Sequence, residues 1–199
     1  MEPPVVKTRG IILKKAELSD SVRLLTVYTE KMGKILVRAK GVGKRDSKLK
    51  GMIEPFNVYE FLLAKSKNIA VLANVYPEKE FIYLRNHLES LSLAIYFCDL
   101  IDKLVFAPER DVKIWTLLSR AMEFLNKPFN FEKEPHALLL NNAGACIKTA
   151  FEEKLLEFLG QATFKIGDKK KQEEKNLYLN SLAGEEIRSF GFLEAISKF

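Results

Sequence analysis

Apolar residues in the first part of the chain come in short runs separated by turn residues, a pattern that predicts β-strands. We expect five strands, at Val5–Leu13, Val22–Thr29, Lys34–Lys40, Ile53–Ala64 and Ile69–Val75. No helix-length apolar pattern lies between most of these runs. Short strands in such close succession favour a small closed barrel of the oligonucleotide-binding (OB) type, and an SH3-like barrel is the alternative that strand number cannot exclude.

After Pro77 the apolar residues recur at three- and four-residue intervals, which predicts helices with one buried face. Three such stripes lie within Leu93–Leu104, Trp115–Leu125 and Ile147–Phe158. We therefore expect an α+β chain of two domains. A five-stranded OB-type barrel occupies residues 1–77, and an all-helical C-terminal domain occupies residues 78–199.

Residues that begin or end helices flank two of these stripes. Asp111 suits the N-cap region of the second helix, and Gly160 suits the C-cap of the third. The polar, lysine-rich stretch Gln161–Asn176 predicts an exposed loop. Ser181–Phe190 predicts a last short helix, which Gly191 ends.

The excess of positive charge is concentrated in one segment of the chain. The chain of 199 residues carries a formal charge of +6. Residues 31–50 hold eight basic side chains and one acid, a net charge of +7, so the rest of the chain is close to neutral. A local excess of this size predicts a partner with many negative charges, such as a nucleic acid.

Strand geometry arranges part of this charge into a row. Successive side chains alternate between the two faces of a strand, so Lys34, Leu36, Arg38 and Lys40 share one face, and Ile35, Val37 and Ala39 face the core. The glycine-containing loop Gly41–Gly51 continues the cationic surface, and its cations can neutralise phosphates. Lysine on an exposed strand also prevents edge aggregation, which is the structural alternative.

Three aromatic residues follow the basic loop, namely Phe56, Tyr59 and Phe61. An aromatic ring that faces outward can stack on a base. Burial in the barrel core is the simpler expectation for the two phenylalanines.

Several chemical classes find no support in the sequence. Gly41-Val42-Gly43-Lys44 is not a Walker loop, because Arg38 and Arg45 occupy the positions that need glycine and serine or threonine. No catalytic motif or acid–histidine cluster is present, so we expect a protein that is not an enzyme. The lone cysteines and histidines have no partner ligand at useful spacing, so we expect no metal and no cofactor. These four residues are Cys98, Cys146, His87 and His136.

The sequence also lacks a pattern for membrane targeting. The first residues have no long apolar centre of a signal peptide. The longest uncharged run, Ala137–Ile147, is too short and too polar to span a bilayer. We expect a cytoplasmic protein that makes no membrane contact.

Six motifs, taken in order, resemble the N-terminal domain of the bacterial RecO family of recombination and DNA-repair mediators. They are Gly10-Ile11-Ile12-Leu13, Ser19–Leu24, Thr29–Lys34, Ala39-Lys40-Gly41, the basic loop Lys44–Lys50 and Glu54-Pro55-Phe56. The resemblance implies an OB barrel followed by helices, binding of single- and double-stranded DNA, and annealing of complementary strands. It also implies work with RecR and with the single-strand-binding protein to load the recombinase. Many relatives carry a four-cysteine zinc module, but residues 160–180 of this chain hold no cysteine.

We therefore hypothesise a non-enzymatic protein that neutralises phosphate charge on DNA. The expected binding residues are Lys34, Arg38, Lys40, Lys44, Arg45, Lys48 and Lys50, with Lys7 and Arg9 on the first strand. One alternative is a barrel that binds RNA or an acidic protein. Another is an enzyme whose site is divided between the two domains.

Overall fold

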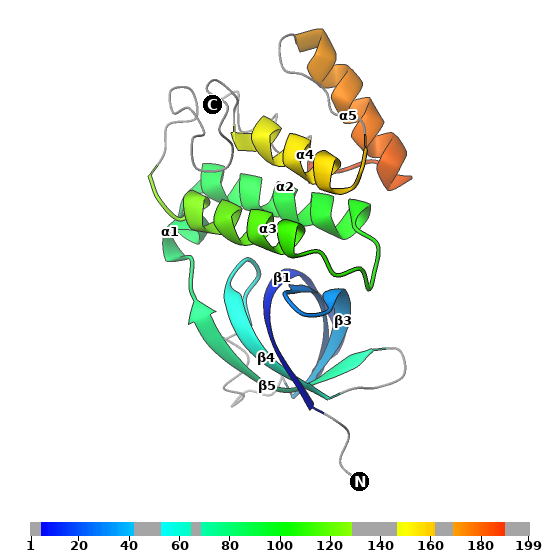
Figure 1. Cartoon of the computed structure of the whole chain (residues 1–199). Coiled ribbons are helices and arrows are strands. Elements are labelled where there is room, and N and C mark those ends of the chain that lie inside the picture. Colours follow the sequence, from blue (N-terminus) through cyan, green and yellow to red (C-terminus); the bar gives the residue numbers. More distant parts are fainter. Residues whose placement is uncertain (1–4, 42–52, 65–68, 129–146, 162–168, 190–199) are drawn as a thin grey trace. The chain divides into compact units, whose positions relative to one another are not determined.

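The structure is a computed structural model that describes residues 5–41, 53–64, 69–128, 147–161 and 169–189, apart from the side chains of residues 169–173. The chain divides into two compact units (Figure 1). One consists of Met1–Phe81 with Phe106–Trp115, and the other of Ile82–Val105 with Thr116–Phe199. The segment Phe106–Trp115 thus groups with the strands, although it follows the first helices in the sequence.

The first unit is a closed barrel of five strands in the order β1-β2-β3-β5-β4. All neighbouring strands are antiparallel except β3 and β5, which are parallel. The five strands are β1 (Val5–Ser19), β2 (Val22–Thr29), β3 (Gly33–Lys40), β4 (Val58–Ala64) and β5 (Ala70–Lys79). A five-stranded barrel followed by helices is the OB-type arrangement, which confirms the expected fold class.

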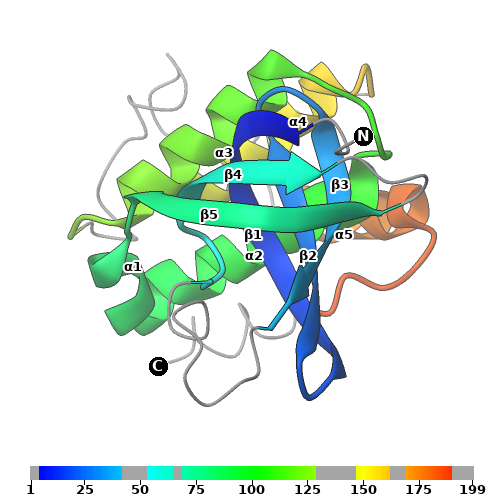
Figure 2. The ribbon, with the colours of Figure 1, turned by 90° about the horizontal axis from the view of Figure 1, so that it is seen from below.

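Strand β1 is long enough to pair with both β4 and β2 along its length (Figure 2). Val5–Ile11 pairs with β4, and Gly10–Ser19 pairs with β2. The register with β2 shifts between Ile12 and Lys14. A bulge of this kind bends the strand and changes which side chains face outward.

The barrel interior is filled by apolar side chains from all five strands, among them Ile12, Leu25, Val37, Phe61 and Val75, which are at most 1% exposed. Burying such side chains stabilises the fold by about 1.5–3 kcal/mol each. This core explains the alternation in the sequence, because only one face of each strand can enter it.

The fourth strand is shorter than expected because a turn precedes it. Pro55 and Phe56 form this turn, and Phe56 has a positive φ of 75°. The hydroxyl of Tyr59 accepts a hydrogen bond from the Glu54 N–H at 2.9 Å and donates one to the Glu54 carbonyl at 3.2 Å. Strand β4 therefore begins at Val58 rather than at Ile53.

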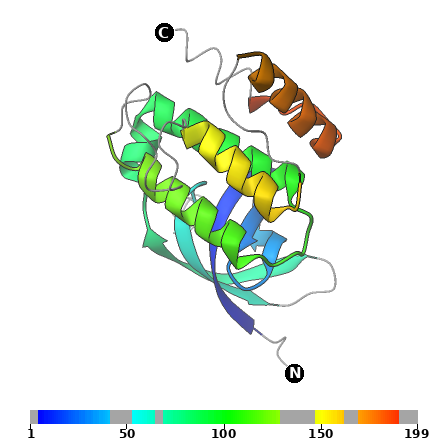
Figure 3. The same cartoon turned by 45° about the horizontal axis from the view of Figure 1, so that its top comes forward.

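The second unit is helical, as expected. Its helices are α1 (Ile82–Asn86), α2 (Leu88–Leu104), most of α3 (Val112–Leu125), α4 (Ile147–Phe158) and α5 (Lys169–Ala183). The ring of Phe97 on α2 stacks on that of Phe151 on α4 at a centroid distance of 4.0 Å, and Figure 3 shows these two helices side by side. The apolar stripes that predicted these helices are largely buried.

Both expected helix caps are confirmed. The side-chain oxygen of Asp111 accepts a hydrogen bond from the Lys113 N–H at 2.6 Å, as an N-cap does. Gly160 has a φ of 68°, and the Gln161 N–H donates to the Leu156 carbonyl at 2.9 Å. This pattern is the Schellman motif that ends a helix at glycine.

The prediction of a loop over Gln161–Asn176 is wrong from Lys169 onward, because α5 begins there. Lys175 on this helix is 3% exposed, and its Nζ lies 2.7 Å from a carboxylate oxygen of the fully buried Glu152 on α4. The Tyr96 hydroxyl donates to the other oxygen of Glu152 at 2.6 Å. The lysine-rich pattern did not indicate a helix, because the burial of Lys175 depends on an ion pair with a residue of another helix. Helix α5 also ends at Ala183, inside the short helix expected over residues 181–190.

Candidate nucleic-acid interface

The outward face of β2 and β3 carries the row of cations that the sequence predicts. Residues that pair across antiparallel strands lie on the same face. Arg38 pairs with Leu24 and Lys40 pairs with Val22, whereas Leu25 and Val37 form a pair inside the barrel. The strand therefore separates its cationic and apolar side chains as its pleat requires.

The three predicted cations of β3 differ in their surroundings. Arg38 and Lys40 are exposed and, within the described part of the chain, make no ion pair. Lys34 is half-buried and pairs in register with the buried Tyr28. The side chain between them, Leu36, is 41% exposed. The open part of this face is thus the end that carries Arg38 and Lys40.

Strand β1 adds a cation, Lys14, that was not among the predicted binding residues. Lys14 is exposed and pairs in register with Thr26 of β2, next to the pair of Thr26 with Leu36 of β3. The bulge after Ile12 puts it on this face. The lysine pair at residues 14 and 15 was the available signal, but the position of a bulge cannot be read from alternation alone. The cationic face is therefore defined here by Lys14, Lys34, Arg38 and Lys40.

Four predicted cations lie outside the described residues. They are Lys44, Arg45, Lys48 and Lys50. Their contribution stays a prediction.

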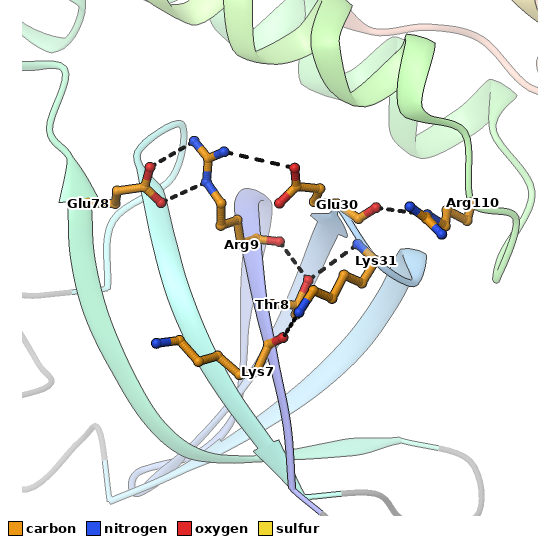
Figure 4. A network of polar contacts seen from close by, with 7 residues as sticks. All are labelled: Lys7, Thr8, Arg9, Glu30, Lys31, Glu78 and Arg110. Carbon is orange, nitrogen blue, oxygen red and sulfur yellow. Dashed lines mark hydrogen bonds and ion pairs between the residues drawn. The ribbon is translucent and has the colours of Figure 1, made fainter.

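Lys7 and Arg9, the two predicted cations of the first strand, lie apart from the cationic face. They are in the half of β1 that pairs with β4, and both are bound to carboxylates. Lys7 lies 2.9 Å from Glu60. Arg9 binds Glu78 through two nitrogens, at 2.8 and 2.7 Å (Figure 4). A charge held by carboxylates adds less to the attraction of a polyanion than an unpaired one.

Arg9 has a structural environment as well as an ionic one. Its guanidinium lies 3.9 Å from the Glu30 carboxylate and 5.6 Å from the ring centre of Trp115. The main-chain carbonyl of Glu30 accepts a hydrogen bond from Arg110 at 3.2 Å (Figure 4). Arg9 thus belongs to a network that connects β1, β5 and the turn after β2 to the segment Phe106–Trp115.

Tyr28 provides a second connection to this segment. Its hydroxyl donates to the carbonyl oxygen of Asp111 at 3.1 Å. Burial raises the pKa of Tyr28 to about 12, so the hydroxyl keeps its proton at neutral pH. This tyrosine holds the segment in place and is not available to a ligand.

The three aromatic residues considered for base stacking are in the interior. Phe56 is 8% exposed, Tyr59 is 1% exposed and Phe61 is fully buried. Tyr59 and Phe61 pack edge to face at a centroid distance of 5.9 Å. The expectation of burial is therefore confirmed for Phe56 and Phe61, and Tyr59 is buried as well.

The described residues show no group of three or more histidine, cysteine or acidic side chains that could hold a metal ion. Cys98 is a buried free thiol, and Cys146 lies outside the described residues. Among the described helices none is both long enough and apolar enough to cross a bilayer.

The closed barrel and its cationic face define an OB-type barrel protein with a surface suited to a polyanion. Residues 1–81 match the family model described as "Recombination protein O N terminal". Over its barrel unit the chain is therefore similar to the RecO family.

Curated relatives from several bacteria extend the similarity beyond the barrel. The chain is 28% identical over 156 residues to "DNA repair protein RecO" of Alkaliphilus metalliredigens and 30% identical over 156 residues to that of Clostridium perfringens. Both alignments cover 78% of this chain and 58% of the relative. The chain therefore spans little more than half the length of these relatives.

Proposed function

We propose that the chain is a non-catalytic DNA-binding protein of DNA repair and homologous recombination. It binds single- and double-stranded DNA and anneals complementary strands. The similarity to the RecO family supports this proposal, since the matched relatives carry the name "DNA repair protein RecO". The family resemblance also makes RecR and the single-strand-binding protein the expected partners, with recombinase loading as the outcome.

The observation that carries the proposal is the separation of charge between two outer faces of the barrel. On the cationic face, Arg38 and Lys40 stand opposite the uncharged Leu24 and Val22. On β1, β4 and β5, by contrast, Lys7 and Arg9 form ion pairs with the carboxylates of Glu60 and Glu78. In OB folds the face of strands two and three is a usual site for oligonucleotides.

The proposed mechanism is charge neutralisation. Two complementary strands repel each other through their phosphates, and a cationic surface that binds both lowers this repulsion. Each phosphate contact also releases condensed counterions, which makes the affinity depend on salt. No bond is made or broken, so the chain needs no catalytic group for this task.

An annealing assay tests the proposal. Two complementary oligonucleotides, one labelled, are mixed with the full chain across a salt series, and the rate of duplex formation is measured. We expect acceleration at low salt that decreases steeply as salt rises. The absence of acceleration at low salt would refute the annealing role.

A triple variant tests the contribution of the basic loop. Replacing Lys44, Arg45 and Lys48 with alanine should flatten the salt dependence of DNA binding by about 2–3 in the log–log slope if each contacts a phosphate. A variant that keeps the affinity and slope of the parent would exclude the loop from the interface.

The alternative of an RNA- or protein-binding barrel has a separate test. Single-stranded DNA bound to the chain is displaced with RNA of the same length or with polyglutamate. Preferential displacement by either competitor would favour the alternative, because a DNA-binding face should retain DNA against both.

A further inference from the structure

The barrel unit contains eight aromatic side chains. All eight belong to the described residues, because the parts of this unit that are not described, 1–4, 42–52 and 65–68, hold none. The eight are Tyr28, Phe56, Tyr59, Phe61, Tyr76, Phe81, Phe106 and Trp115. Six of them are at most 8% exposed, and the two exceptions are Tyr76 and Phe106.

Neither exposed ring lies on the strands that form the cationic face. Tyr76, 47% exposed, is on β5, where it pairs with Glu60 of β4 and its hydroxyl accepts a hydrogen bond from Asn74 at 2.8 Å. Phe106, 77% exposed, lies outside the strands altogether. The cationic face itself offers the aliphatic side chains of Val22, Leu24 and Leu36 between its cations.

This composition decides which part of a nucleic acid the face can hold. Barrels that bind single strands stack bases on aromatic rings, and each stacked base contributes about 1–3 kcal/mol. Cations contact phosphate oxygens whatever the base. The strands of the cationic face offer contacts to phosphates but no exposed aromatic ring on which a base could stack.

We propose that the cationic face binds the phosphodiester backbone alone and leaves the bases unstacked. This inference rests on the proposed function and specifies its ligand as a sugar–phosphate polyanion, regardless of base identity or strandedness. Bases that the protein does not hold remain able to pair, which suits a protein that anneals strands.

The test compares three ligands with equal numbers of phosphates on the full chain: oligothymidylate, an oligomer of abasic sites and a DNA duplex. Dissociation constants are measured by fluorescence anisotropy across a salt series. We expect the abasic oligomer and oligothymidylate to bind within about threefold of each other at every salt concentration, since no stacking is lost. A larger loss on removing the bases would overturn the inference.

Variants of the two exposed rings form a second arm. Tyr76→Ala and Phe106→Ala should each leave the affinity for oligothymidylate within about threefold of the parent, because neither ring holds a base. Arg38→Ala with Lys40→Ala should weaken binding of the thymidylate and abasic oligomers by the same factor. A larger loss from either aromatic variant, or unequal factors for the double variant, would contradict backbone-only binding.

The three ligands distinguish a failure of the proposed function from a failure of backbone-only binding. If none of the three ligands binds, the proposed function fails and this inference with it. If oligothymidylate binds and the abasic oligomer does not, the proposed function stands and only the inference is overturned.

Discussion

At the scale of single residues, Gly33 shows what one of the RecO-like motifs does physically. The hydroxyl of Thr29 donates to the Gly33 carbonyl at 2.9 Å and accepts from the Met32 N–H at 3.0 Å, which closes the turn between β2 and β3. Gly33 has a φ of 66°, and a Cβ at this position would overlap the carbonyl oxygen of Glu109. The motif Thr29–Lys34 thus builds a turn and leaves room for the segment Phe106–Trp115.

Gly33→Ala should lower the free energy of unfolding by about 3 kcal/mol or more, because a positive φ alone costs about 1–2 kcal/mol and the overlap with backbone adds to it. Gly41→Ala is the matched control: its φ is 77°, and its Cβ would meet nothing within 4 Å. Gly41→Ala should lower the free energy of unfolding only by the cost of the positive φ, about 1–2 kcal/mol. Urea unfolding of both variants measures the difference, and equal losses would show that Glu109 does not restrict the position.

At the scale of elements, the segment Phe106–Trp115 is part of the barrel unit through several independent contacts. Tyr28 donates to Asp111, Arg110 donates to Glu30, and Arg9 lies over the ring of Trp115. A cation over an indole ring contributes about 0.5–2 kcal/mol. Arg9 is therefore better explained as a residue that holds this segment than as a contact to DNA.

Arg9→Met should increase amide hydrogen exchange over residues 109–115 and lower the free energy of unfolding by about 1–2 kcal/mol, since two hydrogen bonds to Glu78 and the contact with Trp115 are lost. Lys7→Met, which removes one ion pair of a side chain that is 62% exposed, is the control. It should change stability by less than about 1 kcal/mol and leave the exchange unchanged. Unchanged exchange in Arg9→Met would contradict the role of Arg9 in holding the segment.

The sequence predicts the strands and the first helices because burial imposes a period that is visible in the residues. Val22–Thr29 was predicted with the bounds that β2 has in the structure, and the stripe Leu93–Leu104 is the buried face of α2. Helix α5 was missed because its pattern is polar, and the ion pair of Lys175 with Glu152 depends on a residue distant in sequence. Contacts of this kind leave no local period.

The same limit applies to the candidate site. Alternation places Arg38 and Lys40 on one outward face, and the structure has them there. It cannot show that Arg9 is bound to Glu78, which is far along the chain. Nor can it locate the bulge that brings Lys14 to the same face.

At the scale of the whole molecule, the distribution of charge matters more than its sum. The chain carries a formal charge of +6, yet the cations of β1 near β4 are matched by carboxylates. The surplus lies in residues 31–50, which include the two exposed cations of β3. The outward end of β3 that carries Arg38 and Lys40 should therefore attract a polyanion.

The most direct test is the slope of the logarithm of the DNA-binding constant against the logarithm of the salt concentration. The parent is compared with Arg38→Ala/Lys40→Ala and with Arg120→Ala/Lys127→Ala, a control that removes one exposed arginine and one exposed lysine of the helical unit. For single-stranded DNA the first variant should lose about 1.4 from the magnitude of the slope, or 0.7 per phosphate contact, and the control should lose nothing. A parent-like slope and affinity in Arg38→Ala/Lys40→Ala, or an equal loss in both variants, would contradict the assignment of the cationic face.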